Sequence, residues 1–94
     1  MNEIRTVHVR VEGLVQGVGY RAWTESMARI LRLTGWVRNR RDGSVEMVLH
    51  GSAGEVAEML RLCERGPLHA EVTKVEILGE GVGAYLDFEV RPSA

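Results

Sequence analysis

The fold is decided by residues 6–21, which read TVHVRVE-GLVQGVGYR. In residues 6–12, valines alternate with polar residues, and this period of two predicts a strand with one buried face. The buried side consists of Val7, Val9 and Val11. Glycines recur in residues 13–20, directly after this pattern. The stretch therefore predicts a strand that leads through a glycine-rich loop into the next element.

From Arg21 onward, the apolar residues are spaced as on one side of a helix. This stripe consists of Trp23, Met27, Ile30 and Leu31. On the polar side, Glu25 and Arg29 are four residues apart, a spacing that favours an ion pair. We expect a helix of about four turns with Gly35 as its stop.

Two strands are predicted in residues 36–40 and 44–50, joined by a hairpin around Asp42-Gly43. The buried side of the second strand consists of Val45, Met47 and Leu49. A two-residue turn would bury two arginines opposite these residues, whereas a three-residue loop of residues 41–43 places Val37 and Asn39 there. We therefore expect the three-residue loop and an Asn39 side chain that points inward.

The second half of the chain repeats the strand–helix–strand order. Ser52 and Glu55 form the pattern of a capping box. The stripe of the following helix consists of Val56, Met59, Leu60 and Cys63, and the helix ends at Gly66-Pro67. Residues 71–78 are predicted to form a strand whose imperfect alternation indicates a bulge, residues 79–83 a turn, and the residues around Leu86, Phe88 and Val90 a last strand with alternating apolar side chains. The β-α-β-β-α-β order predicts an α+β, ferredoxin-like sandwich, in which an antiparallel sheet carries two helices on one face.

Composition excludes several classes of protein. The chain has 94 residues, 12 basic and 13 acidic side chains, and one cysteine. We expect a single domain over residues 1–94, a monomer by default, with no internal disulfide and no metal or cofactor. The nearly balanced charge argues against a nucleic-acid partner. Because no apolar stretch is long enough to span a membrane or to act as a leader, we expect a cytoplasmic protein.

The start of the first helix departs from the usual chemistry of helix termini. Residues 15–20 provide no Ser, Thr, Asp or Asn to cap the free amides. Arg21 places a cation at the positive end of the helix dipole, which costs about 0.3–1 kcal/mol. A bound oxyanion would correct both defects, and Gly17 and Gly19 would let the backbone curl around it. The alternative is a plain glycine loop with Arg21 in solvent.

Topology is expected to bring Asn39 toward Arg21, although the two are 18 positions apart. A β-α-β crossover makes its two strands parallel, so their C-terminal ends lie at the same edge of the sheet. The glycine loop leaves the first strand at that edge, and Asn39 is the penultimate residue of the second strand. The alternative is that Asn39 caps its own hairpin.

The residues at this edge restrict the reaction. The loop lacks the Gly-Lys-Ser/Thr of a Walker phosphate loop and holds no Cys, Ser, Asp or His as a nucleophile. Cys63 belongs to an apolar stripe, and the three histidines are best explained as surface residues. Water would therefore attack, oriented by the Asn39 amide. An acyl phosphate suits this arrangement, because its leaving carboxylate has a conjugate acid with a pKa of about 4 and needs no proton.

Two segments carry a resemblance to a known family. GLVQGVGYR at residues 13–21 and GWVRNRRDGSVE at residues 35–46 closely resemble the two signature segments of the acylphosphatases. The likeness extends over nearly the whole chain, including Gly66-Pro67. One departure is Leu14, where a basic residue is frequent; we expect it to affect only the rim of the pocket.

The resemblance implies a ferredoxin-like fold and metal-independent hydrolysis of acyl phosphates to a carboxylate and inorganic phosphate. It implies that Arg21 binds the phosphate and that Asn39 orients the attacking water. The implied phosphate-binding loop consists of Val15, Gln16, Gly17, Val18, Gly19, Tyr20 and Arg21. The implied partners are a small acyl phosphate and phosphate- or sulfate-like anions.

Two other functions fit the same topology. An RNA-binding domain of this topology presents aromatic residues on its central strands, but here residues 6–12 and 44–50 place none on their outward side. A module that handles carbamoyl phosphate within a larger hydrogenase-maturation protein would be followed by zinc-finger cysteines, and residues 1–94 contain none. Both alternatives are therefore less favoured than an acylphosphatase.

Overall fold

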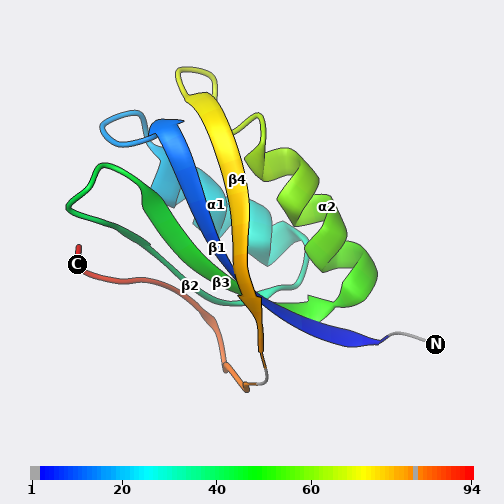
Figure 1. Cartoon of the computed structure of the whole chain (residues 1–94). Helices are drawn as coiled ribbons and strands as arrows, with labels where there is room; N and C mark the ends of the chain where they lie inside the picture. Colours follow the sequence, from blue (N-terminus) through cyan, green and yellow to red (C-terminus); the bar gives the residue numbers. More distant parts are fainter. Residues whose placement is uncertain (1–2, 82) are drawn as a thin grey trace.

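The computed structural model describes residues 3–81 and 83–94, so predictions for residues 1–2 and 82 lie outside the described residues. Two helices cover one face of a five-stranded sheet (Figure 1). The elements are β1 (Ile4–Leu14), α1 (Tyr20–Ile30), β2 (Thr34–Asn39), β3 (Val45–Ser52), α2 (Ala53–Cys63), β4 (Glu71–Glu80) and β5 (Phe88–Val90). The predicted ferredoxin-like order is confirmed.

The sheet has the strand order β4-β1-β3-β2-β5. Its β1–β3, β1–β4 and β2–β3 pairs are antiparallel as predicted, whereas β5 pairs with β2 in parallel. The reason is that β4 runs opposite to β1 and β2, and the chain reverses before β5. The last strand is also shorter than predicted, because Leu86 is fully exposed and pairing starts at Phe88, which is buried.

The predicted register of the β2–β3 hairpin is confirmed. Val37 lies opposite Met47, and Asn39 lies opposite Val45. The connecting loop is closed by a hydrogen bond of 3.1 Å from the Gly43 amide to the Arg40 carbonyl, with Gly43 at a φ of 93°. Because side chains alternate along a strand, this register places Asn39 on the helix-covered face.

The predicted irregularity of the β4 pairing is also confirmed. The register between β1 and β4 shifts between His8 and Val9 and again between Glu12 and Gly13. β4 continues to Glu80, two residues beyond the predicted strand, so residues 79–80 do not form a turn.

Helix α1 differs from its prediction in its buried face and in its end. Its buried residues are Tyr20, Thr24 and Ala28, whereas Ile30 is exposed. Trp23, Met27 and Leu31 are partly buried at the edge of the core. The helix ends at Ile30, and the Leu33 amide donates to the Ala28 carbonyl over 2.8 Å. The left-handed residue of this end is Arg32, with a φ of 60°.

Gly35 is therefore not a helix stop but a residue of β2. Its φ is 134°, and a Cβ at this position would lie 2.0 Å from the Val48 carbonyl oxygen of the neighbouring strand. Glycine is required here by the close approach of two strands.

Helix α2 has the predicted cap and the predicted stripe, but it ends at Cys63, before the predicted stop at Gly66-Pro67. The Ser52 hydroxyl donates to Glu55 over 2.9 Å and accepts from the Glu55 amide over 3.3 Å. The stripe residues Val56, Met59 and Cys63 are buried in the core, and Leu60 is partly buried against it.

Candidate active site

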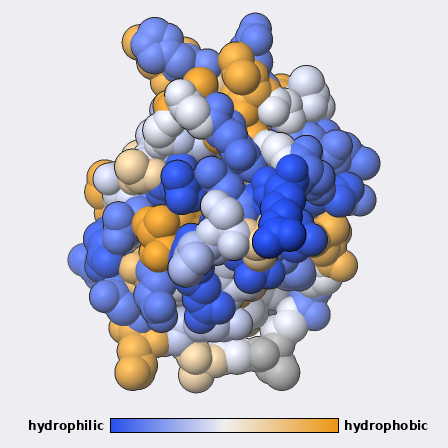
Figure 2. Space-filling model, turned by 90° about the vertical axis from the view of Figure 1, so that its left-hand side faces the viewer, coloured by the Kyte–Doolittle hydropathy of each residue, from blue (hydrophilic) through white to orange (hydrophobic). Residues whose placement is uncertain are grey.

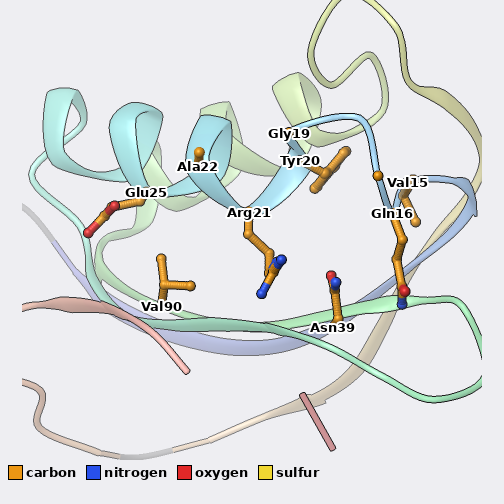
Figure 3. Close-up of a pocket in the computed structure, with 10 residues that line it drawn as sticks. Val15, Gln16, Gly19, Tyr20, Arg21, Ala22, Glu25, Asn39 and Val90 are labelled. Atoms are coloured by element: carbon orange, nitrogen blue, oxygen red, sulfur yellow. The ribbon is translucent and has the colours of Figure 1, made fainter. Parts of the chain in front are cut away.

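A cavity of about 320 Å³ lies between the start of α1 and the end of β2. Figure 3 shows the Arg21 and Asn39 side chains approaching this space from opposite sides. Its lining residues are Val15, Gln16, Gly17, Gly19, Tyr20, Arg21, Ala22, Glu25, Asn39 and Val90. The order of strands and helices predicted that Arg21 and Asn39 would lie close together, and both residues line this cavity. Of the predicted loop residues, Val18 does not line it but packs against the core.

The loop before α1 leaves the helix N-terminus open. The residue at the N-cap is Gly19, with a φ of 81°, and Gly17 has a φ of 75°. Within residues 3–81 and 83–94, no side chain caps this terminus, and the first turn of the helix has no acidic residue. The first amides of a helix have no partner inside the helix, so they remain available to an anion.

Arg21 is partly buried and extends from the first turn of α1 toward the cavity (Figure 3). None of the ion pairs formed within the described part of the chain involves Arg21. A guanidinium presents a planar set of donors that matches the oxygens of a phosphate group. The side chain is therefore placed to bind an oxyanion next to the open amides.

Asn39 is the last residue of β2, and its side chain points from the strand toward the side of the cavity formed by α1 (Figure 3). Its Oδ1 atom is buried and has no hydrogen-bond partner among the residues that the structure describes. Leaving a buried polar atom unpaired costs about 1–3 kcal/mol. The amide does not cap the hairpin through this oxygen, which argues against the alternative structural role.

The structure gives the Gln16 side chain a contact that sequence analysis missed. Its Nε2 donates to the carbonyl oxygens of Arg40 and Ser44, over 2.7 and 2.8 Å. These bonds join the glycine loop to the hairpin that carries Asn39. No pattern in the sequence predicts them, because the acceptors are backbone carbonyls 24 and 28 positions away.

Tyr20 fixes the other side of the loop. Its side chain is 1% exposed, and its hydroxyl donates to the Cys63 carbonyl of α2 over 2.7 Å. Burial raises the pKa of Tyr20, and its contact with Cys63 raises it further, so the phenol stays a donor. The first residue of α1 is therefore held by the last residue of α2.

Glu25 and Val90 form the opposite end of the cavity from Gln16 (Figure 3). The predicted ion pair is present, with 3.2 Å between Arg29 Nη2 and Glu25 Oε2. The helical pattern of the sequence places Glu25 only on the polar side of the helix, and it carries no signal of the position of Glu25 beside the cavity.

The cysteine and the three histidines, which the sequence did not indicate as catalytic residues, do not line this cavity. Cys63 is buried in the core, and burial raises the pKa of its thiol to about 12. His8 bonds to Glu46, His50 bonds to Thr6, and His69 is exposed. These contacts agree with the structural roles that were expected.

The face that carries the glycine loop and the hairpin tip is mainly hydrophilic (Figure 2). In the described residues, no three His, Cys, Asp or Glu side chains are grouped so that they could hold a metal ion. No helix in the same residues combines the length and the apolar character needed to cross a membrane.

Fold and site together define a class of protein, a ferredoxin-like domain with an uncapped helix terminus, an arginine and an asparagine around a cavity at one edge of its sheet. Comparison with known proteins makes the class specific. The Acylphosphatase family model matches residues 7–90, and the chain belongs to this family.

Relatives and solved structures agree with this assignment. An acylphosphatase of Synechococcus sp. is 45% identical over 93 residues, which cover 99% of each chain. One from Rhodopseudomonas palustris is 59% identical over 68 residues, covering 72% of this chain and 69% of the relative. The structure of an acylphosphatase from Coxiella burnetii matches with a TM-score of 0.90 and 38% identity, over 96% of this chain and 94% of that one. The chain is therefore a hydrolase of the family that cleaves acyl phosphates to a carboxylate and inorganic phosphate.

Proposed function

We propose that the cavity between α1 and β2 is the active site, in which Arg21 and the amides of residues 15–20 bind the phosphoryl group and Asn39 orients the attacking water. The observation that carries this proposal is the buried Oδ1 of Asn39, which has no protein partner in the described residues and lies in the same cavity as Arg21. A carbonyl oxygen accepts a hydrogen bond from water, so it directs the lone pair of that water away from itself. An unpaired buried acceptor is then explained by its function.

Each group has a separate task in this mechanism. Helix amides and the Arg21 guanidinium stabilise the negative charge of the phosphoryl oxygens, which is the main requirement of such a transfer. Asn39 holds water in position for attack on phosphorus, and the carboxylate leaves opposite to it. Because a carboxylate is a stable leaving group at neutral pH, no general acid is required. The reaction depends on positioning and on charge, which these residues supply.

The direct test is the release of phosphate from benzoyl phosphate, measured with and without an excess of EDTA. We expect equal rates in both conditions, because the mechanism uses protein groups only. An alkyl phosphate provides the matched control, since its alkoxide leaving group requires protonation and should be released far more slowly. Loss of activity in EDTA would contradict metal independence, and no release from benzoyl phosphate would contradict the active-site assignment.

Inorganic phosphate and sulfate should bind at the same cradle as the substrate's phosphoryl group and inhibit competitively. Support for this comes from the open helix terminus and from the Arg21 guanidinium beside it, which forms no ion pair within residues 3–81 and 83–94. We further propose a monomeric, single-domain protein over residues 1–94 that acts in the cytoplasm. The one hydrophobic core shared by the described elements supports a single domain, and the buried thiol of Cys63 is not accessible for a disulfide between two copies of the chain.

A further inference from the structure

A buried carboxylate lies on the face of the sheet opposite to the active site. Glu46 belongs to β3, and its side chain is 4% exposed. Acidic side chains are rarely buried to this extent unless cations compensate their charge. The proposed reaction makes no direct use of Glu46, so its burial requires another explanation.

Three cationic or potentially cationic side chains converge on Glu46. Arg38 Nε and Arg40 Nη1 donate to its Oε1 over 2.7 and 2.9 Å, and His8 Nε2 bonds to Oε2. Burial would raise the pKa of Glu46, but the hydrogen bonds from Arg38, His8 and Arg40 outweigh it and lower the pKa to about 2. The carboxylate is therefore ionised throughout the neutral range.

The two arginines flank Asn39 in the sequence of β2. Arg38 and Arg40 point to the outer face of the sheet, whereas Asn39 between them points to the active site. Arg38 is additionally held against the Trp36 ring, with its guanidinium carbon 4.9 Å from the ring centroid. One carboxylate oxygen thus fixes the side chains on both sides of Asn39.

The backbone of Arg40 is fixed from the other side. Its amide donates to the Ser44 carbonyl over 2.9 Å, and its carbonyl accepts from Gln16 Nε2 over 2.7 Å. Glu46 holds the side chain of this same residue. Residues 38–40, which carry the Asn39 amide, are therefore held by Gln16 on one face of the sheet and by Glu46 on the other.

We propose that Glu46 is a positioning residue for the reaction, which acts through Arg38 and Arg40 to hold Asn39 in the orientation that directs water at the phosphoryl group. The inference rests on the proposed role of Asn39. Without the carboxylate charge, the two guanidinium groups that share Oε1 would repel each other and move apart. The end of β2 would then lose the fixed geometry on which the water depends.

The test compares Glu46→Gln with Glu58→Gln, a control on α2. Glu58 also binds an arginine, Arg61, over 2.9 and 2.6 Å, and both residues of this pair lie on α2 rather than on the strands that hold Asn39. We expect Glu46→Gln to lower kcat by about tenfold at a temperature where both proteins are folded, since misplacements of about 1 Å can cost about 100-fold. Inhibition by inorganic phosphate should stay within about twofold, because Arg21 and the loop amides lie on other elements. The control should keep its kcat.

A double-mutant cycle separates positioning from general stabilisation. In the Asn39→Ala background, Glu46→Gln should have little further effect on kcat, because its route to the reaction is already removed. An unchanged kcat in Glu46→Gln, or the same fold-loss with and without Asn39, would overturn the inference. If Asn39→Ala itself retained full kcat, the proposed role of Asn39 would be wrong. This outcome differs from the two above, which contradict only the role of Glu46.

Arg40→Met provides a second variant in case Glu46→Gln does not fold. This side chain is 39% exposed, and methionine keeps most of its apolar length while it removes the bond to Glu46. We expect a smaller loss of kcat in the same direction, with phosphate inhibition again unchanged. An Arg40→Met protein with wild-type kcat would contradict the route through Arg40.

Discussion

The two helices of this molecule begin in opposite ways. The N-cap residue of α2 is Ser52, whose side chain exchanges hydrogen bonds with Glu55, so this terminus is closed by its own residues. The N-cap residue of α1 is Gly19, no side chain of the described residues caps that terminus, and the first turn carries Arg21. Both helices have 11 residues and pack on the same sheet, so the difference does not reflect size or location.

The comparison separates residues that serve stability from residues that serve binding. A capped terminus contributes about 1 kcal/mol to the free energy of unfolding and leaves few donors for a ligand. An open terminus with a cation gives up this contribution but attracts an anion. The uncapped terminus, which is unfavourable for the helix alone, lies at the proposed active site, whereas the terminus with a favourable cap lies away from it. Functional sites are where such locally unfavourable features are expected.

The largest effect is expected from Arg21→Ala. Turnover of benzoyl phosphate should fall by at least about 1,000-fold, because the variant loses a charged donor to the transferring phosphoryl group. Inhibition by inorganic phosphate should weaken as well. Arg61→Ala is the control, since Arg61 is an exposed arginine of α2 whose ion-pair partner is Glu58. Retention of activity in Arg21→Ala would show that the open terminus of α1 is not the phosphate site.

Asn39→Ala should have the next largest effect. We expect kcat to fall by about 100- to 1,000-fold, the range for loss of one transition-state contact, with a smaller change in phosphate inhibition. Circular dichroism should show a folded protein, since the lost oxygen has no partner in the described residues. Full kcat in this variant would remove the water-orienting role from Asn39.

Ser52→Ala tests the other helix. The variant should lose about 1 kcal/mol in the free energy of unfolding, measured by urea denaturation, because the cap of α2 is removed. Its kcat should equal that of the wild type. A large fall in kcat at unchanged stability would mean that the N-terminus of α2 also contributes to the reaction, and not only to the stability of the protein.

The smallest effect concerns stability in Arg21→Ala. In buffer without phosphate or sulfate, this variant should be more stable than the wild type by about 0.3–1 kcal/mol, because a cation is removed from the positive end of α1. Addition of phosphate at tenfold its dissociation constant should stabilise the wild type by about 1.4 kcal/mol and the variant much less. Equal stabilisation of both proteins by phosphate would place the anion elsewhere.

Much of the fold is predictable because the alternation of apolar and polar residues identifies the buried face of each strand. The choice of hairpin register followed from the cost of burying two arginines, and the structure places Asn39 opposite Val45 as expected. The prediction for α1 was less accurate, because hydropathy ranks Ile30 above Thr24 as a core residue. Thr24 is nevertheless buried, since a small side chain lets the helix approach the sheet and its hydroxyl donates to the Tyr20 carbonyl over 2.8 Å.

The candidate site was predictable as far as topology determines it. A β-α-β crossover makes β1 and β2 parallel, so the glycine loop and the end of β2 share one edge of the sheet, and Arg21 and Asn39 line the same cavity there. The contacts of Gln16 and Glu46 were not predictable. A hydrogen bond requires its donor and acceptor to lie about 3 Å apart. The alternation of apolar and polar residues shows which face of a strand a side chain is on, but not which carbonyl or guanidinium group lies within that distance.

The hydroxyl of Tyr20 has a consequence for how the open terminus of α1 behaves before substrate arrives. Uncapped helix ends ordinarily fray, and a frayed end would have to become ordered at the expense of binding energy. Here the first residue of the helix is anchored to the Cys63 carbonyl of α2, so its amides are preorganised by the tertiary structure. A distant main-chain carbonyl thus provides the rigidity that a cap gives elsewhere, without occupying the donors that the anion needs.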